Sequence, residues 1–320
     1  MSEYIVPIPG AAPDRVVDRL PLVFRIQSIE RLPFDARNVL SRAALFHDRA
    51  TLTVEWLSHH VDVRLIVGSP VSIRWQGRPV CTGGAVRIAR LVLLEKPDPA
   101  VNLFETVQHG WVHDRALLQR AASLWDALPR GFGHLFNAIF WDGGRLHRYV
   151  AGPSSLAGHH REFSGNLRHS VEVAERALAL AARDAHACAE VLILAALLHD
   201  AGKADEYRPV RGRFELTARG RLVGHRNTII EWIAAARARH RVIVPEAGYL
   251  ALIHALTCAK GAPPWLGLRE PQSLDAAILS VADRLSGQGE LIARHAPRQT
   301  GFGRYHPHLG MRPFVIRPSF

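Results

Sequence analysis

An apolar helical segment that ends in a histidine and an aspartate places the strongest constraint on the fold of this chain. Residues 188–198 are apolar on nearly every side, which is the pattern of a helix buried in the interior of a domain. His199 and Asp200 follow directly, and Gly202 suits the end of a helix. A carboxylate beside a buried helix is costly unless a positive charge compensates it, and a divalent cation shared with His199 would do so. The segment therefore predicts a helical domain built around a metal ion.

Two other helical patterns supply further ligands for this predicted site. Residues 167–182 have apolar side chains at helical spacing with His169 in the first turn, and residues 273–285 carry Asp283 beside their apolar stripe. If the first of these helices runs antiparallel to the buried helix, His169 approaches the His-Asp pair. A single buried histidine is more often a hydrogen-bonded core residue than a ligand. The ordered set of four, each on a helix near apolar residues, instead favours a metal site.

The charge and the cysteines narrow the function classes. The chain of 320 residues has 40 Lys+Arg against 29 Asp+Glu, a net charge of +11, and a basic surface attracts polyanions, most often nucleic acid. The sequence contains no apolar run of about 18 residues, the length that would predict a membrane-spanning helix. Its first residues lack the pattern of a signal peptide. The three cysteines are scattered without a CxxC pair, as in a reduced protein. We therefore expect a cytoplasmic protein with no membrane partner.

The first hundred residues carry β-strand patterns. Residues 1–18 are rich in proline and small residues and predict an extended arm. Within residues 19–97, five short segments separated by turns predict a small closed barrel of the oligonucleotide-binding (OB) type. Their alternation places these side chains outward: Arg25, Thr51, Thr53, Glu55, Arg74 and Arg87. Trp56 and Trp75 could stack on bases or fill the barrel interior. Trp56 and Arg74 are our candidates here for binding a nucleic-acid strand.

The rest of the chain divides, in order, into a helical connector, the metal-binding domain and a C-terminal tail: residues 98–158, 159–290 and 291–320. The tail is rich in Arg, His, Pro and Gly, and its aromatic residues could anchor it on the body or on a neighbouring subunit of a homo-oligomer. His159, His160 and Arg161 stand in a loop of small residues before the helix of His169. They predict either a grip on the backbone of a substrate or a flexible basic loop.

Several motifs resemble a known family. His169, the pair His199–Asp200 and Asp283, in this order, resemble the HD superfamily of metal-dependent phosphohydrolases, which has an all-helical fold. Other motifs are similar to the YhaM-type 3′-to-5′ exoribonucleases: Gly158-His-His-Arg, Leu197-Leu-His-Asp-Ala-Gly-Lys and Phe214-Glu-Leu-Thr, followed by Gly224-His225. In that family an OB barrel precedes the HD domain, and the resemblance spans roughly residues 20–290. Conjugative relaxases share a similar histidine-rich segment and remain an alternative.

The resemblance implies a multidomain protein of α and β structure, with a small N-terminal OB-like β-barrel followed by an all-helical HD domain. It also implies a divalent metal ion as cofactor. Ligands that are only nitrogen and oxygen suit Mn²⁺ better than a thiolate-bound zinc. The implied ligands of the main site are His169, His199, Asp200 and Asp283.

A weaker second metal site would use Asp200, His225 and His254. After the position of His254 the family pattern continues to Ser-His-His-Gly, and a histidine there helps to bind a second ion. This chain has Cys258-Ala-Lys-Gly261 instead. We therefore expect one metal ion rather than two.

The implied activity is that of a metal-dependent phosphodiesterase, a 3′-to-5′ exonuclease on single-stranded RNA or DNA, with RNA favoured. Asp200 and Lys203 would act at the reacting phosphate, Lys203 by neutralising its charge; a lysine there would equally offset the helix dipole. Two alternatives remain open. One is an HD phosphohydrolase of small nucleotides, with the barrel as a cap. The other is a non-catalytic nucleic-acid-binding protein with a structural metal site.

Overall fold

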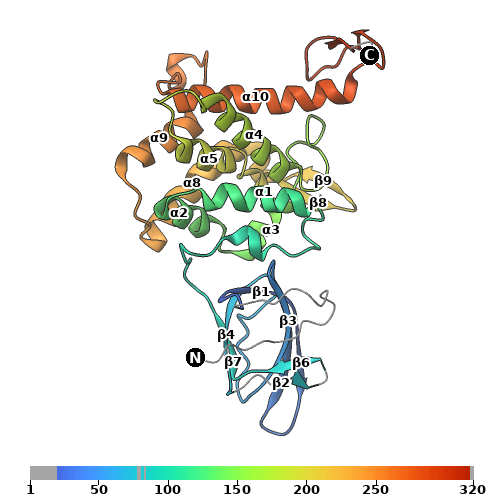
Figure 1. Ribbon diagram of the computed structural model, residues 1–320, viewed down its shortest axis with the longest axis vertical. Coiled ribbons are helices and arrows are strands. Elements are labelled where there is room, and N and C mark those ends of the chain that lie inside the picture. Colours follow the sequence, from blue (N-terminus) through green and yellow to red (C-terminus); the bar gives the residue numbers. More distant parts are fainter. Residues whose placement is uncertain (1–19, 78–80, 83, 318–320) are drawn as a thin grey trace. The chain divides into compact units, whose positions relative to one another are not determined.

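The computed structural model describes residues 20–77, 81–82 and 84–317 (Figure 1). The chain divides into two compact units, which we describe one at a time. Unit 1 comprises Met1–Ala122 and Phe136–His147, and unit 2 comprises Ser123–Leu135 and Arg148–Phe320. The predicted arm, residues 1–18, lies outside the described residues. Within the described part, no helix is both long and apolar enough to cross a bilayer.

A seven-stranded mixed sheet forms the body of unit 1. Its strands are β1 (Phe24–Pro33), β2 (Val39–His47), β3 (Ala50–Ser58), β4 (Pro70–Arg74), β5 (Cys81–Thr82), β6 (Ala85–Arg87) and β7 (Arg90–Leu93). They lie in the order β5-β6-β3-β2-β1-β4-β7, and β3 and β6 are the parallel pair.

The sheet curls (Figure 1), but β5 and β7 lie at its opposite edges. The prediction of a closed barrel is therefore wrong for the described residues. The edge strands β5 and β7 have only two and four residues. Strands this short can form few hydrogen bonds with each other, so the two edges of the sheet are not joined. The OB-like identity of this curled sheet stays a prediction.

The core of unit 1 contains one of the two predicted base-stacking rings. Trp56 is 6% exposed and packs with Phe24, Leu45 and Val54 in the apolar cluster of the sheet. In that position Trp56 fills the core, which is the second of its two predicted roles, and its ring is not presented to a base. Trp75 is 36% exposed, and Arg74 is exposed as the alternation predicts.

Two charged side chains that the alternation places outward are buried instead. Arg25 is fully buried; its guanidinium donates to the carbonyl of Gly68 at 2.6 Å and to Thr106 Oγ1 at 3.0 Å. Burial lowers the pKa of Arg25 to about 10. Glu55 is 5% exposed and pairs with Arg42 at 3.2 Å. The alternation of inward and outward side chains along a strand was misleading here. It cannot show which polar side chains form hydrogen bonds or ion pairs with residues elsewhere in the fold.

Four helices follow the sheet: η1 (Leu103–Thr106), α1 (Arg115–Asp126), α2 (Arg130–Phe140) and α3 (Gly143–Ala151). The division between the units falls inside α1, α2 and α3, so the helical connector belongs partly to each unit. Within unit 1, the ring of Phe136 packs against Phe104 and Phe140, with centroids 5.3 and 4.8 Å apart.

Unit 2 is mainly helical. Its larger helices are α4 (Gly165–Ala181), α5 (Ala189–Leu198), α8 (Gly224–His240), α9 (Glu246–Thr257) and α10 (Leu274–His295). Its shorter elements are α6 (Lys203–Glu206), β8 (Tyr207–Val210), β9 (Arg213–Leu216), α7 (Ala218–Leu222), η2 (Pro264–Leu266), β10 (Gly301–Phe302) and β11 (Phe314–Val315). Every residue of α5 from Val191 to Leu198 is buried, and α4, α9 and α10 pack around it. The predicted buried helix is thus the centre of this unit.

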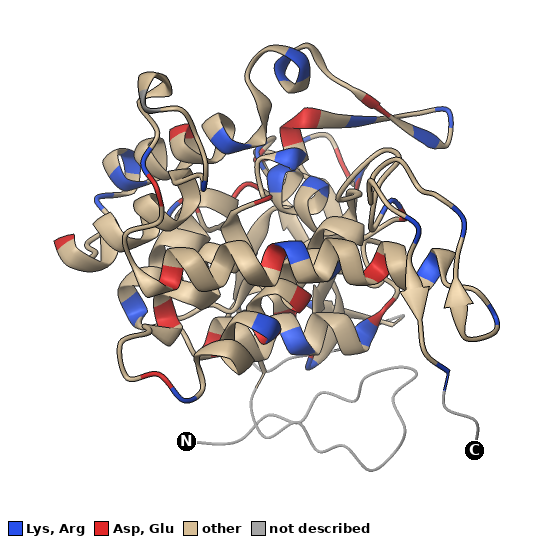
Figure 2. Ribbon diagram, turned by 90° about the horizontal axis from the view of Figure 1, so that it is seen from above, with Lys and Arg blue, Asp and Glu red and all other residues tan. Residues whose placement is uncertain are grey.

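A β-hairpin interrupts the helices, so the expected all-helical fold is wrong in this detail. Strands β8 and β9 pair in antiparallel fashion, and the two residues of their turn, Arg211 and Gly212, both have positive φ, 48° and 80°. Two such residues make the turn that best fits the twist of a short hairpin. The hairpin extends away from the helices at the upper right of Figure 2.

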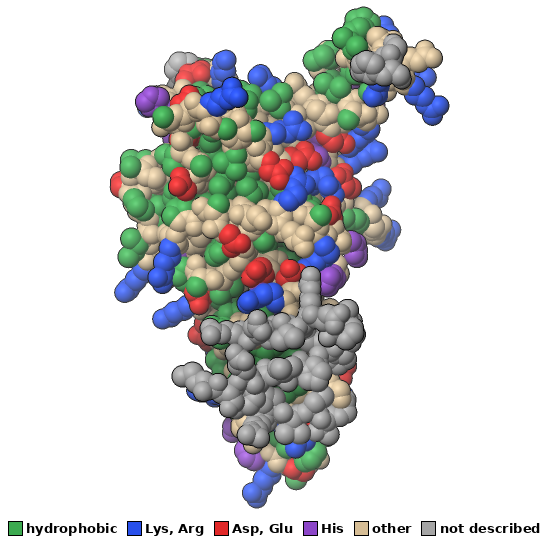
Figure 3. All heavy atoms as spheres, viewed as in Figure 1, with side chains coloured by type: hydrophobic (Ala, Val, Ile, Leu, Met, Phe, Trp, Pro, Cys, Tyr) green, Lys and Arg blue, Asp and Glu red, His purple; other side chains and the backbone are tan. Residues whose placement is uncertain are grey.

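Figure 3 shows charged side chains of both signs on one face of unit 2. On the face seen in Figure 3, acidic and basic side chains lie interspersed among apolar ones rather than in a single patch. The excess positive charge of +11 therefore forms no single basic patch on that face.

Candidate metal centre

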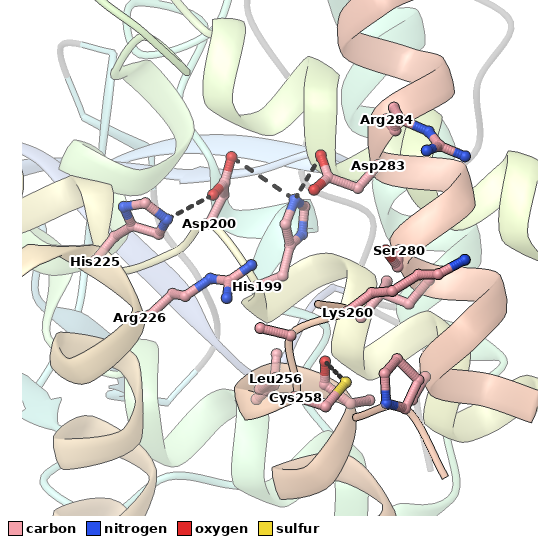
Figure 4. A pocket seen from close by; sticks show the side chains of 15 residues that line it. His199, Asp200, His225, Arg226, Leu256, Cys258, Lys260, Ser280, Asp283 and Arg284 are labelled. Carbon is pink, nitrogen blue, oxygen red and sulfur yellow. Dashed lines mark hydrogen bonds and ion pairs between the residues drawn. The ribbon is translucent and has the colours of Figure 1, made fainter. Parts of the chain in front are cut away.

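The four predicted ligands come together from three helices of unit 2. His169 is the fifth residue of α4, His199 and Asp200 directly follow α5, and Asp283 lies in α10. Nε2 of His169 is 3.3 Å from Nε2 of His199, 3.1 Å from Oδ1 of Asp283 and 3.4 Å from Oδ2 of Asp200. Figure 4 shows His199, Asp200 and Asp283 pointing toward one another. The structure thus joins residues that are up to 114 positions apart in the sequence.

This donor set fits a divalent cation. The ligand atoms of His169, His199 and Asp283 all lie within 4.8 Å of one another, and a carboxylate oxygen of Asp200 is 3.7 Å from His199 Nε2. Two imidazole nitrogens and two carboxylate oxygens suit a first-row divalent ion. Burial lowers the pKa of His169, which favours the neutral ring that a metal ligand requires.

Two glycines allow the backbone segments of the site to meet. A Cβ on Gly165 would lie 2.0 Å from the carbonyl oxygen of His160, and a Cβ on Gly202 would lie 2.2 Å from that of His225. Any larger residue would push these segments apart. Gly165 begins the helix of His169, and Gly202 follows the His-Asp pair by two positions, so each glycine fixes one side of the ligand cluster.

Buried hydrogen bonds orient the two histidine ligands. Nδ1 of His199 lies 2.8 Å from the carbonyl oxygen of Ala196, which makes Nδ1 the donor. Nδ1 of His169 lies 3.1 Å from Ser286 Oγ, and that hydroxyl donates to Glu172 Oε2 at 2.9 Å. In both rings the lone pair of Nε2 is thereby directed at the cluster, which is the usual arrangement around a protein metal site.

The predicted catalytic pair, Asp200 and Lys203, forms an ion pair. Lys203 Nζ lies 2.5 Å from Oδ2 of Asp200, and both side chains are about nine-tenths buried. Burial opposes ionisation of Asp200, but Lys203 and the neighbouring histidines hold its pKa well below the ordinary range. The ammonium of Lys203 is therefore occupied by a ligand carboxylate, and its direct effect is to keep Asp200 charged and oriented.

Of the two residues predicted to extend the site, the structure brings in only one. His225, at the start of α8, lies 3.4 Å from Oδ1 of Asp200 through Nε2 and 2.8 Å from Glu206 through Nδ1. Nε2 of His254 instead accepts a hydrogen bond from the backbone of Gln272 at 2.9 Å. The structure therefore does not bring His254 to the cluster, because α9 turns this ring toward the segment before α10.

Sequence reasoning missed Glu206, the partner of His225. Glu206 ends α6, which begins at Lys203, so its spacing of three from Lys203 places it on the same side of a short helix. That spacing was the available signal.

The two histidines of the loop before α4 are packed inward. His160 is 2% exposed and its Nε2 lies 3.4 Å from Glu172. The ring of His159 lies 4.7 Å from that of His169, and burial lowers the pKa of His159 to about 4. Arg161 is exposed. Of the three residues predicted to grip a substrate, only Arg161 is freely accessible.

A pocket adjoins the ligand cluster. Its volume is about 430 Å³, and it is lined by His199, Asp200, His225 and Asp283 together with apolar residues of α9 and α10 (Figure 4). Three cations from three different segments also line it: Arg226, Lys260 and Arg284. None of the three forms an ion pair with a described residue. The pocket thus joins a metal-ligand cluster to uncompensated positive charge, a combination that suits a phosphate-bearing substrate.

Comparisons with known proteins agree with this geometry. The family profile of the HD domain matches residues 166–288, which include all four ligands and His225. Neither the curated proteins nor the solved structures gave a significant match. The segment that holds the metal centre therefore matches the HD domain, whose members are typically metal-dependent hydrolases.

Proposed function

We propose that the protein is a metal-dependent phosphodiesterase that shortens single-stranded RNA from its 3′ end. The observation that carries the proposal is the junction of a four-ligand cluster with a pocket containing three unpaired cations. A volume of about 430 Å³ is that of a site for one small ligand, such as the terminal nucleotide of a strand. Single-stranded DNA is the alternative substrate, because it has the same phosphodiester backbone.

The residues have separate roles in such a reaction. His169, His199, Asp200 and Asp283 would hold a divalent cation, which when bound lowers the pKa of water and polarises a phosphoryl oxygen. Lys203 keeps the carboxylate of Asp200 ionised and in place. Arg226, Lys260 and Arg284 would bind the non-bridging oxygens of the substrate, since their charges have no protein partner among the described residues.

A labelled strand provides the test. The full chain with Mn²⁺ should convert a 5′-labelled single-stranded RNA into a ladder of shorter products, and a chelator should stop the reaction. Asp283→Asn should abolish shortening without unfolding the protein, because the Asp283 side chain is 42% exposed. Asp205→Asn is the matched control, since Asp205 is a half-buried carboxylate that pairs with Arg148 outside the ligand cluster. A strand left intact by the wild type under Mn²⁺ would refute the proposal.

The size of the pocket also favours a second candidate, hydrolysis of free nucleotides. A cavity of about 430 Å³ can enclose a mononucleotide without any strand attached. Consumption of nucleoside triphosphates or cyclic dinucleotides, with RNA left intact, would select this alternative over the exonuclease.

A further inference from the structure

An exposed aromatic ring, Phe163, packs against a half-buried one, Phe214, on two segments that lead from the metal centre. Phe163 is 66% exposed, and its ring meets that of Phe214 edge-to-face with centroids 5.3 Å apart. Phe163 belongs to the loop before α4, and Phe214 belongs to β9 of the hairpin. Neither residue enters the metal site or its pocket. An exposed ring alone needs no ligand, so the inference depends on the charges that surround this pair.

Both segments are fixed at their bases by the metal centre itself. In the loop, the carbonyl of His160 packs against Gly165 at the start of the helix that bears His169. The hairpin starts directly after Glu206, which binds Nδ1 of His225 at 2.8 Å. The two rings are thus held by the same segments that hold the ligands, so a molecule bound across them is positioned relative to the reacting phosphate.

The surroundings of the rings are positively charged. Arg161 on the loop and Arg208 and Arg211 on the hairpin are exposed, and none of them pairs with an acidic side chain among the described residues. By contrast, Arg213 of the same hairpin is compensated by Glu215 at 3.7 Å. Aromatic faces for bases and unpaired arginines for phosphates are the two components of a surface that binds single strands without reading their sequence.

We propose that Phe163 and Phe214 form a base-stacking platform for the part of a single-stranded nucleic acid that lies 5′ of the nucleotide in the metal centre. Arg161, Arg208 and Arg211 contact its phosphates. The proposal rests on the proposed function, because it assigns that enzyme a polymeric substrate. It predicts that the platform contributes to strand binding and contributes nothing specific to the binding of a small diester.

Binding and turnover can be measured separately. The affinity of the full chain for a fluorescent single-stranded oligonucleotide is measured by anisotropy in a chelator, so that no hydrolysis occurs. Phe163→Ala should weaken this binding about tenfold, the range expected for the loss of one stacked base, and Phe163→Trp should restore it. Arg211→Ala should weaken binding and lower the slope of log Kd against log salt by about one.

The chain offers a closely matched control. Phe302 is 65% exposed and also packs against a second phenylalanine, Phe314, at 4.8 Å. Phe302→Ala should therefore remove as much exposed ring surface without affecting strand affinity. With Mn²⁺ present, Phe163→Ala should raise the KM for the strand about tenfold relative to the KM for bis(p-nitrophenyl) phosphate.

The outcomes separate the two proposals. Equal strand affinities for the wild type and Phe163→Ala would overturn the platform, as would an equal loss in Phe302→Ala. Binding of another protein at these rings, with no affinity for the strand, would overturn it too. Failure of the wild type to shorten the strand in Mn²⁺ would overturn the proposed function instead, while the affinity comparison in chelator would still decide the platform.

Discussion

Removal of the Ser286 hydroxyl should weaken metal binding by about 5- to 30-fold. Ser286 Oγ lies 3.1 Å from Nδ1 of His169 and 2.9 Å from Glu172 Oε2, and Ser286 and His169 are both fully buried. Such a hydrogen bond contributes about 1 kcal/mol, and a buried donor left without a partner costs about 1–3 kcal/mol. We assign about 1–2 kcal/mol of this cost to the loss of the orientation in which the imidazole of His169 binds the metal ion. A loss of that size corresponds to a metal affinity about 5- to 30-fold weaker.

The affinity of Ser286→Ala for Mn²⁺ can be measured by competition with a chromophoric chelator. Ser170→Ala serves as control, because Ser170 is a fully buried serine on the same helix as His169 and bonds to no described metal ligand. Ser286→Cys should lie between the wild type and Ser286→Ala, since a thiol is a weaker hydrogen-bonding group of similar shape. If Ser286→Ala and the wild type bind Mn²⁺ equally well, the argument that this hydroxyl orients His169 is refuted.

Two other substitutions test the packing and the charge around the site. Gly202→Ala should lower the unfolding temperature and abolish metal binding, because its Cβ would lie 2.2 Å from the carbonyl oxygen of His225, whereas Gly110→Ala meets nothing within 4 Å and should be tolerated in the same thermal scan. Burial opposes ionisation of Glu172, but hydrogen bonding from His160 lowers its pKa from 4.5 to about 2. The ionised carboxylate should therefore stabilise the fold above pH 4.5, and this contribution should be lost as the pH falls toward about 2. Thermal scans across this range should show a smaller slope for Glu172→Gln, and an unchanged slope would contradict the assignment.

The centre of the HD domain could be predicted from the sequence because its signals are local. The all-apolar segment before His199 predicted the buried helix α5, and ligands near apolar stripes predicted a shared ion. Spacing could not show that His254 turns away, since that depends on how α9 packs beside Gln272. Spacing also could not show that Arg226, Lys260 and Arg284, which come from three separate segments, line one pocket.

The sheet of unit 1 shows a different limit. Strand patterns predicted most of its elements, but closure of a barrel depends on the length of the last strands and on partners across the sheet. Arg25 shows the same limit for a single residue, since its burial follows from acceptors at Gly68 and Thr106 that lie 43 and 81 positions away. Alternation describes one strand at a time and contains no information about such distant acceptors.

The close backbone contacts at Gly165 and Gly202 have a consequence for how the protein handles its ion. Since glycine packing and the Lys203–Asp200 pair already gather the ligands, the binding of an ion does not have to drive folding, in contrast to small domains that are unfolded without their metal. The cofactor can then leave and return while the polypeptide keeps its shape. The identity of the resident ion would then depend on supply as well as on the affinity of the site.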